Sequence, residues 1–234
     1  MKVAVVNFTG TVGKTTIAVN LLSPRMNGAP IFAIESINKT AEGIGLDVEK
    51  LRGEEFRELL QRIVIQDDAI IDVGASNVED FMANLESFDS AHEEIDFYIV
   101  PVTSGTKEQQ ETIAMIKSLS AIGIPAEKIR VVFNRVQREV ISEFPMVLNF
   151  HSAQPIFTLN LKCAIYENEL FDALSINNLS FEGLMADTTD YKTLLKNKDA
   201  DPEDRAQWSD MFGLKLLCNG VNKKLDVVYD NLFL

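Results

Sequence analysis

The sequence predicts a doubly wound α/β fold, in which a mainly parallel sheet carries helices on both faces and a helical C-terminal appendage follows. Two observations predict this class. Short apolar runs rich in Val, Ile and Phe alternate with longer amphipathic stretches, as in repeated βαβ units. A turn containing glycines and a lysine joins the first apolar run directly to a helix-compatible stretch. The length of 234 residues and a hydrophobic content of 46% suit one packed domain of this kind.

The strands and helices are expected in alternation along the chain. Buried parallel strands are predicted at residues 2–7, 31–35, 69–73, 97–102 and 129–133, with crossover helices at 14–22, 54–65, 78–88 and 107–121. The pattern weakens after residue 155, where a sixth strand at 156–159 and helices at 167–174 and 203–217 are expected. The last eight residues are expected to form a terminal helix on the core. We therefore divide the chain into a main α/β domain, residues 1–195, and a helical appendage, residues 196–234, packed on the same domain.

Composition excludes several function classes. The net charge is −13, and lysines in the last third are interspersed with acids, which argues against direct DNA binding. No segment approaches the ~18 uncharged apolar residues of a membrane span. The start, Met1-Lys2 followed by a strand, leaves no room for a signal sequence, so a cytoplasmic location is expected. Cys163 and Cys218 lack metal-ligand spacing and are expected to be reduced core thiols.

Residues 8–16, Phe-Thr-Gly-Thr-Val-Gly-Lys-Thr-Thr, have the pattern of a phosphate-binding loop. Such a loop needs backbone N–H groups that point inward, an ammonium for the β- and γ-phosphates and a hydroxyl for Mg²⁺. Lys14 supplies the ammonium and Thr15 the hydroxyl, and a helix beginning there would direct its positive dipole end at the phosphates. The residues expected to bind nucleotide are Thr9, Gly10, Thr11, Val12, Gly13, Lys14, Thr15 and Thr16.

The third predicted strand ends in a second candidate segment, Ile-Ile-Asp-Val-Gly, at residues 70–74. An acid at a strand end is typical of a Walker B segment, so Asp72 is expected to hold Mg²⁺ through water. Gly74 lacks a Cβ that would obstruct its backbone, so its N–H is expected to approach the γ-phosphate and distinguish ATP from ADP. The metal ligands predicted from the sequence are thus Thr15 and Asp72.

The spacing of the phosphate loop resembles the deviant Walker A loop of the ParA/MinD P-loop ATPases, K-G-G-x-G-K-[ST]. Thr9 occupies the position of the signature lysine and Thr11 that of the second glycine. In that family the signature lysine reaches the partner's nucleotide across a dimer. The resemblance therefore implies an ATP-dependent homodimer, in which this chain lacks one cross-subunit contact.

The same resemblance implies further site residues. Glu35 matches the first acid of the family's Asp-x-Asp segment, Ile37 stands where the second acid positions the attacking water, and Asn38 can orient water without accepting its proton as a carboxylate does. Slow hydrolysis is therefore expected. Asn134 matches the asparagine that recognises adenine, and the aspartate of the guanine signature is absent, which favours ATP over GTP. The expected catalytic residues are Lys14, Asp72, Glu35 and Asn38.

Several strings more specifically resemble the StbB plasmid-stability proteins. They lie at residues 7–10, 12–16, 35–38, 72–80, 107–113, 132–134 and 187–192. This resemblance implies a bacterial, plasmid-encoded, Mg²⁺-dependent ATPase switch. It would act in plasmid stability or partition, intracellular positioning or conjugative transfer, beside a separate plasmid-encoded DNA-binding protein.

Two other readings of the nucleotide site stay open. A small-molecule kinase or ATP-dependent ligase on the related fold would use ATP to activate a metabolite, and Arg135 and Arg138 are the clustered arginines available to it. A nucleotide-binding adaptor with little hydrolysis would explain the missing second acid and signature lysine. Turnover measurements separate these readings from the switch.

Overall fold

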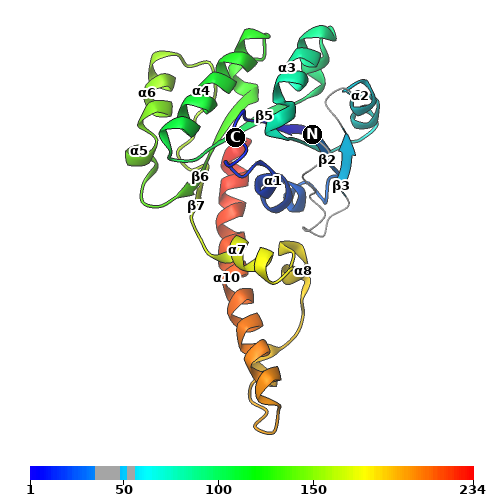
Figure 1. Ribbon diagram of the computed structural model, residues 1–234, viewed down its shortest axis with the longest axis vertical. Helices are drawn as coiled ribbons and strands as arrows, with labels where there is room; N and C mark the ends of the chain where they lie inside the picture. Colours follow the sequence, from blue (N-terminus) through cyan, green and yellow to red (C-terminus); the bar gives the residue numbers. More distant parts are fainter. Residues whose placement is uncertain (35–47, 52–55) are drawn as a thin grey trace.

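A seven-stranded parallel sheet forms the centre of the molecule (Figure 1). The computed structural model describes residues 1–34, 48–51 and 56–234. Within these, the strand order is β3-β2-β4-β1-β5-β6-β7. All pairs are parallel, so the carboxyl ends of the strands share one edge, where ligands bind in such sheets. The strands are β1 (Lys2–Val5), β2 (Ile31–Ile34), β3 (Val48–Leu51), β4 (Ala69–Val73), β5 (Phe97–Val102), β6 (Ile129–Val136) and β7 (Ala164–Tyr166).

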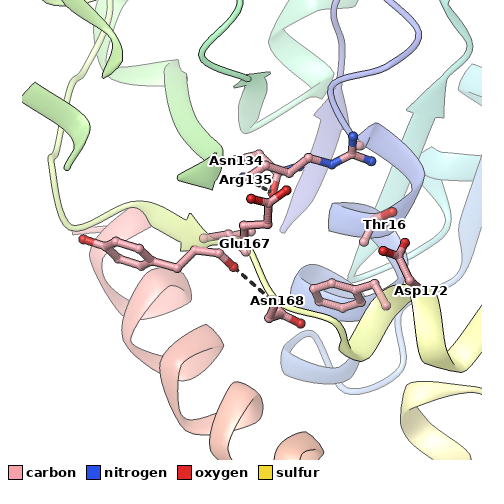
Figure 2. A pocket seen from close by; sticks show the side chains of 10 residues that line it. Thr16, Asn134, Arg135, Glu167, Asn168 and Asp172 are labelled. Carbon is pink, nitrogen blue, oxygen red and sulfur yellow. Dashed lines mark hydrogen bonds between the residues drawn. The ribbon is translucent and has the colours of Figure 1, made fainter. Parts of the chain in front are cut away.

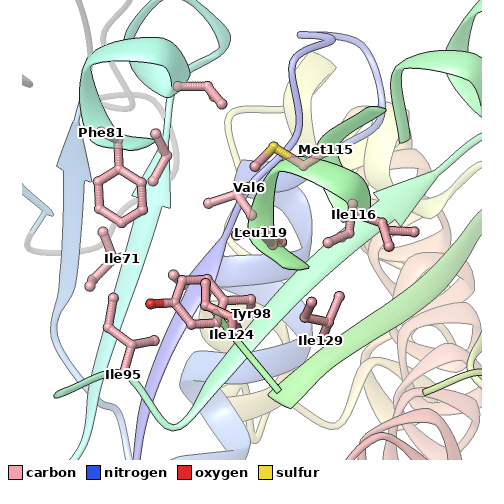
Figure 3. Packing of buried hydrophobic residues seen from close by; sticks show 14 of the residues in the cluster. Val6, Ile71, Phe81, Ile95, Tyr98, Met115, Ile116, Leu119, Ile124 and Ile129 are labelled. Atoms are coloured by element: carbon pink, nitrogen blue, oxygen red, sulfur yellow. The ribbon is translucent and has the colours of Figure 1, made fainter. Parts of the chain in front are cut away.

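Helices cover both faces of the sheet because successive strand side chains point to opposite sides. Ala4 belongs to one hydrophobic cluster, and its neighbours Val3 and Val5 belong to the other. Figure 3 shows the first cluster, where Tyr98 of β5 packs beneath Leu119 of a covering helix. The helices of the first face are α2 (Phe56–Val64), α3 (Val78–Ser87), α4 (Thr106–Ala121), α5 (Val140–Glu143) and α6 (Pro145–Ala153). Those of the second face are α1 (Lys14–Ile17), α7 (Leu170–Ile176), α8 (Phe181–Ala186) and α10 (Pro202–Leu232). The predicted fold class is therefore confirmed.

The helix after the first strand differs from the prediction. It is α-helical only in α1, continues as a π-helical turn η1 (Ala18–Leu22) and ends as a 3-10 turn η2 (Ser23–Arg25). The wider turn leaves the backbone carbonyls of Asn20 and Leu21 available, and the Arg25 guanidinium donates to both, at 3.1 and 3.2 Å. The Arg25 side chain therefore satisfies backbone carbonyls in a segment whose apolar sequence alone predicts an uninterrupted α-helix.

Two strands were not anticipated, and one expected strand is wrong. β3 forms an edge of the sheet beside β2. Residues 156–159 make only a single bridge, between Thr158 and Arg130, because the chain then turns and the Cys163 N–H bonds the Asn160 carbonyl. Pairing along β6 resumes at β7, which ends at the edge where the other strands also end. The loop after β7 consequently joins the candidate site.

Residues Pro202–Leu232 form one long helix, α10, where a helix at 203–217 and a separate terminal helix were expected. α10 begins at the N-cap Asp201, whose side chain accepts from the Glu203 N–H. Its second half packs on the sheet through the buried residues Cys218, Val221, Leu225, Val228 and Leu232, whereas its first half projects away from the sheet (Figure 1). Both cysteines are buried and free. The division of the chain at residue 195 stays a prediction.

The segment before α9 (Tyr191–Leu194) fastens this projecting half to the body. The Tyr191 hydroxyl donates to the Asp187 carboxylate at 2.7 Å, and the Lys215 ammonium of α10 donates to the Asp187 carbonyl. Hydrogen bonds from Thr189 and Tyr191 lower the pKa of Asp187 to about 2. The motif at 187–192 therefore has a structural role here. Among the described residues, no helix has the length and apolarity needed to cross a membrane.

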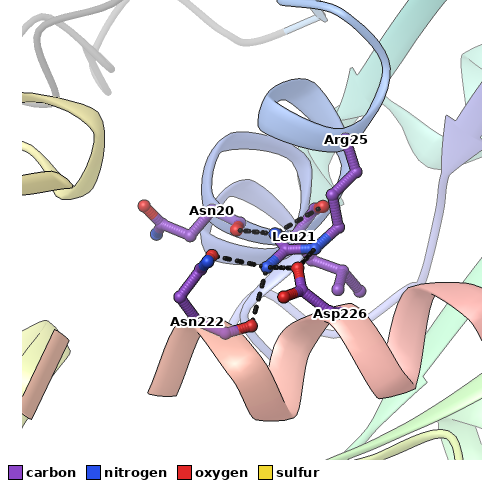
Figure 4. Close-up of polar contacts among 5 residues, drawn as sticks. All are labelled: Asn20, Leu21, Arg25, Asn222 and Asp226. Carbon is purple, nitrogen blue, oxygen red and sulfur yellow. Dashed lines mark hydrogen bonds and ion pairs between the residues drawn. The ribbon is translucent and has the colours of Figure 1, made fainter. Parts of the chain in front are cut away.

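Arg25 links the end of the first helix to α10 (Figure 4). Its guanidinium donates to the Asn222 carbonyl at 2.9 Å, to the Asn222 side-chain oxygen at 2.7 Å and to Asp226 at 2.9 Å. The Arg25 side chain is only 9% exposed. The helix that begins at the phosphate loop is thus anchored to the last helix of the fold.

Candidate functional site

The loop at residues 8–16 lies between β1 and α1 at the carboxyl edge of the sheet. Gly13 caps α1 with φ 83°, a left-handed conformation that glycine adopts without strain. Lys14 is buried, and its ammonium donates to the Asn7 carbonyl at 3.2 Å and to the Thr9 carbonyl at 2.8 Å. The Lys14 side chain is therefore folded over the loop, where its ammonium is expected to bind the β- and γ-phosphates.

Asn7 fixes the start of this loop and is a positioning residue that the sequence analysis missed. Its fully buried amide donates to the Pro101 carbonyl and to the Thr112 hydroxyl, both at 2.8 Å. Its side-chain oxygen accepts from the Thr9 N–H at 3.1 Å. The available signal was an amide residue ending a strand of valines directly before the loop. Asn7 thus ties the loop to the neighbouring strand β5 and to α4.

Thr15 and Asp72 lie together, as predicted metal ligands must. The Thr15 hydroxyl donates to Asp72 Oδ2 at 2.6 Å, while Asp72 Oδ1 is buried and has no hydrogen-bond partner among the described residues. Burial raises the pKa of Asp72, and the Thr15 hydrogen bond and the Lys14 charge act against this rise. A buried, orphaned carboxylate oxygen beside a hydroxyl fits a hard divalent cation such as Mg²⁺.

Gly74 follows Asp72, and its backbone is engaged within the sheet. Its N–H donates to the Ile34 carbonyl at 2.8 Å, which extends the pairing between β4 and β2. The predicted contact of this N–H with a γ-phosphate would require that hydrogen bond to be exchanged, and it stays a prediction. The phosphate loop does face this segment, because a Cβ added to Gly10 would lie 3.8 Å from Ala75 Cβ.

Asn134 reaches the phosphate loop from β6. Its amide donates to the Val12 carbonyl at 2.8 Å, and its side-chain oxygen accepts from the Arg135 N–H at 3.0 Å. A Cβ added to Gly13 would lie 2.5 Å from Asn134 Nδ2. Both polar groups of this amide are therefore used within the protein, and its recognition of adenine stays a prediction.

A pocket of about 170 Å³ opens beside the loop (Figure 2). It lies between the start of α1, the end of β6 and the segment that leads from β7 into α7. The sequence analysis missed its β7 side because β7 itself was not recognised. The residues that line it are Gly13, Thr16, Asn134, Arg135, Ile165, Tyr166, Glu167, Asn168, Phe171 and Asp172.

The remaining predicted residues are placed as follows. Glu35, Ile37 and Asn38 lie outside the described residues. Thr9 and Thr11 are neighbours in the loop, with their hydroxyl oxygens 3.4 Å apart. Thr9, at the position of the signature lysine, therefore offers a hydroxyl in place of an ammonium.

Comparison with known proteins identifies the fold. No protein-family model matches the sequence, and no curated protein does. Three similar solved structures are the cell division ATPase MinD of Pyrococcus furiosus, apo McdA of Cyanothece and the septum site-determining protein MinD of Pyrococcus horikoshii with Mg-ADP. The first is 13% identical with a TM-score of 0.52, covering 96% of this chain and 98% of that chain. McdA is 15% identical with a TM-score of 0.51, covering 79% and 92%. The third is 15% identical with a TM-score of 0.50, covering 95% and 96%. The chain thus has the fold of ParA/MinD-type P-loop ATPases.

Proposed function

We propose that this chain is a molecular switch that binds and hydrolyses Mg-ATP. The observation that carries the proposal is the hydrogen bond from Thr15 of the phosphate loop to Asp72, whose second carboxylate oxygen is buried and has no partner within the described part of the chain. A buried carboxylate oxygen without a hydrogen bond lowers the stability of the fold, so its presence here favours a ligand that binds to it.

The phosphate loop supplies the groups that a nucleotide triphosphate needs. Gly13 opens α1 with its N-terminus facing the loop, and backbone N–H groups there favour anions. The Lys14 ammonium, held in the free protein by the carbonyls of Asn7 and Thr9, is positioned to exchange those contacts for phosphate oxygens. Binding would then replace two neutral acceptors by charged ones, which are stronger partners for an ammonium.

Thr15 and Asp72 would hold Mg²⁺. The ion would supply a positive charge next to the phosphates and would stabilise negative charge that develops on them during hydrolysis. Lys14 lies close enough to Asp72 for its charge to lower the pKa of that carboxyl. The proposal includes slow turnover, because Ile37 stands where the ATPases that the sequence resembles carry the second acid, and Asn38 can orient water but cannot accept its proton as a carboxylate does.

The biological role is proposed from the sequence strings that resemble StbB proteins. We place the switch in plasmid stability or partition, intracellular positioning or conjugative transfer. ATP would favour a homodimer, and a separate plasmid-encoded protein would bind DNA, in keeping with the net charge of −13. Because residue 9 is threonine, a cross-subunit contact of the lysine type would have to come from another side chain.

The test is nucleotide binding by Lys14→Ala, measured by calorimetry with ATP and Mg²⁺. We expect this variant to lose at least ~100-fold in ATP affinity, because the ammonium is the loop's charged phosphate ligand. Lys162→Ala, which removes an exposed lysine, is the matched control and should bind as the wild type does. Circular dichroism establishes that Lys14→Ala is folded. Unchanged ATP affinity in a folded Lys14→Ala protein would overturn the site assignment.

Turnover and sedimentation test the rest of the proposal. Phosphate release from ATP alone, with sedimentation as a dimer in ATP and as a monomer in ADP, supports a switch. Turnover only when a metabolite is added would favour a kinase or ligase, and ATP binding without turnover would favour an adaptor. A monomer in both nucleotides would contradict the dimer model.

A further inference from the structure

Asp172 contributes a carboxylate to the pocket beside the phosphate loop. It lies in the first turn of α7 and lines the same pocket as Thr16, near which its carboxylate lies in Figure 2. The residue is exposed, and no hydrogen bond or ion pair engages its carboxylate among the described residues. Its carboxylate is therefore open to a ligand that enters the pocket.

Three other polar side chains around the pocket, those of Asn168, Glu167 and Asn134, are engaged within the protein. Asn168 donates to the Tyr166 carbonyl at 2.9 Å and accepts from the Leu170 N–H at 3.1 Å. Glu167 accepts from the Gln137 side chain at 2.9 Å. Both amide groups of Asn134 are used as described above. Of the two carboxylates in this lining, Asp172 is thus the one without a hydrogen-bond partner among the described residues.

The order of groups in a nucleotide can be matched to the order of residues along the pocket. Phosphates belong at the Gly13 and Thr16 end, where α1 begins. The base then extends towards Asn134 and Glu167, at the ends of β6 and β7. Asp172 lies beside Thr16 (Figure 2), and the ribose is the part of a nucleotide that directly follows the phosphates and joins them to the base.

Of the parts of a nucleotide, the ribose is the one that suits a carboxylate partner. A carboxylate accepts hydrogen bonds and repels phosphate, whereas the vicinal hydroxyls of ribose are donors. Acidic side chains bind ribose hydroxyls in this way in dinucleotide-binding folds. The adjacent Phe171 adds an apolar surface to the same wall of the pocket.

We infer that Asp172 binds the ribose hydroxyls and makes the site selective for ribonucleotides over deoxyribonucleotides. This inference rests on the proposed ATP-binding function and concerns the same site. The carboxylate touches the sugar and takes no part in hydrolysis. Because the pocket is open to water, each missing hydroxyl should weaken binding roughly five- to ten-fold, less than in a closed site.

The experiment compares the affinities of ATP, 2′-deoxy-ATP and 3′-deoxy-ATP, with Mg²⁺, for three full-length proteins. These are the wild type, Asp172→Ala and the matched control Glu169→Ala, which removes an exposed acid three residues away that does not line the pocket. Circular dichroism establishes that each variant is folded. The wild type and Glu169→Ala should bind both deoxy analogues roughly five- to ten-fold more weakly than ATP. Asp172→Ala should bind all three alike, roughly 25- to 100-fold more weakly than the wild type binds ATP, because it loses the contacts to both hydroxyls at once.

The outcomes separate this inference from the proposed function. Equal binding of the three nucleotides by the wild type overturns the ribose contact and leaves ATP binding intact. Asp172→Ala that loses affinity for all three by the same factor also overturns it, because the carboxylate then acts on something other than the hydroxyls. A wild-type protein that binds none of the three refutes the nucleotide site itself, and the inference with it.

Discussion

Replacing Gly13 by alanine tests how the phosphate loop is held. The added Cβ would sit 2.5 Å from Asn134 Nδ2, and the residue must keep φ near 83°. The left-handed conformation costs alanine about 1–2 kcal/mol, and displacing the hydrogen bond from Asn134 to the Val12 carbonyl adds about 1 kcal/mol. We expect Gly13→Ala to lose about 2–3 kcal/mol of unfolding free energy, a fall of about 5–10 °C in Tm for a chain of this size.

Urea unfolding of the single and double variants separates these two costs. Asn134→Ala removes the side chain that the new Cβ meets. The double variant should therefore lose about 1 kcal/mol less unfolding free energy than the sum of the losses in the two single variants. Gly10→Ala is the control in the same loop, because its Cβ would be 3.8 Å from Ala75 Cβ and its φ is not positive. Effects of Gly13→Ala and Asn134→Ala that add within about 0.5 kcal/mol would refute the contact, and a Gly13→Ala protein as stable as the wild type would refute the whole account.

Two further predictions concern buried charges. Burial holds the pKa of Asp72 above its ordinary 3.8, so its carboxyl binds more protons in the folded state and the wild type loses stability as the pH rises from 3.8 through the folded pKa. Without ligand, Asp72→Asn should therefore be more stable than the wild type at pH 8, by roughly 1–2 kcal/mol, and the difference should be smaller at pH 4. Urea unfolding at both pH values measures this. A stability difference that grows on acidification would contradict the reasoning. Arg25→Ala should lose about 3 kcal/mol in the same assay, because it leaves the Asn222 carbonyl and neighbouring acceptors without their buried donor. Asp226→Ala should lose less than about 1 kcal/mol, since that carboxylate is 53% exposed, and equal losses in the two variants would argue against the clamp.

The sequence predicted the centre of the fold because the central strands are mostly apolar. β4 and β5 were placed at their observed bounds for this reason, and the neighbouring strands nearly so. β7 has three residues, too few for a periodic signal, and β3, Val-Glu-Lys-Leu, combines two charges with two apolar residues. The loop that β7 leads into was consequently missed, and with it the Asp172 wall of the pocket.

The candidate site shows a similar limit. Spacing placed Thr15 and Asp72 together because each ends or follows a strand at the same edge of the sheet. Spacing could not show which hydrogen bonds a side chain already makes. Asn134 has the donor and acceptor that adenine requires, yet both are engaged with Val12 and Arg135. Asn7 was given no role from the sequence, yet its hydrogen bonds hold the loop.

The contact of Arg25 with α10 sets the order in which the chain can mature during translation. Arg25 and Asp226 are 201 positions apart, so at a synthesis rate of about 5–20 residues per second their meeting comes roughly 10–40 s after Arg25 is made. Until then the guanidinium lacks its α10 acceptors, and the apolar face of η1 lacks its cover. A ribosome-bound chain that has already made its phosphate loop should therefore be unable to hold nucleotide firmly, and capture of ATP should coincide with emergence of α10.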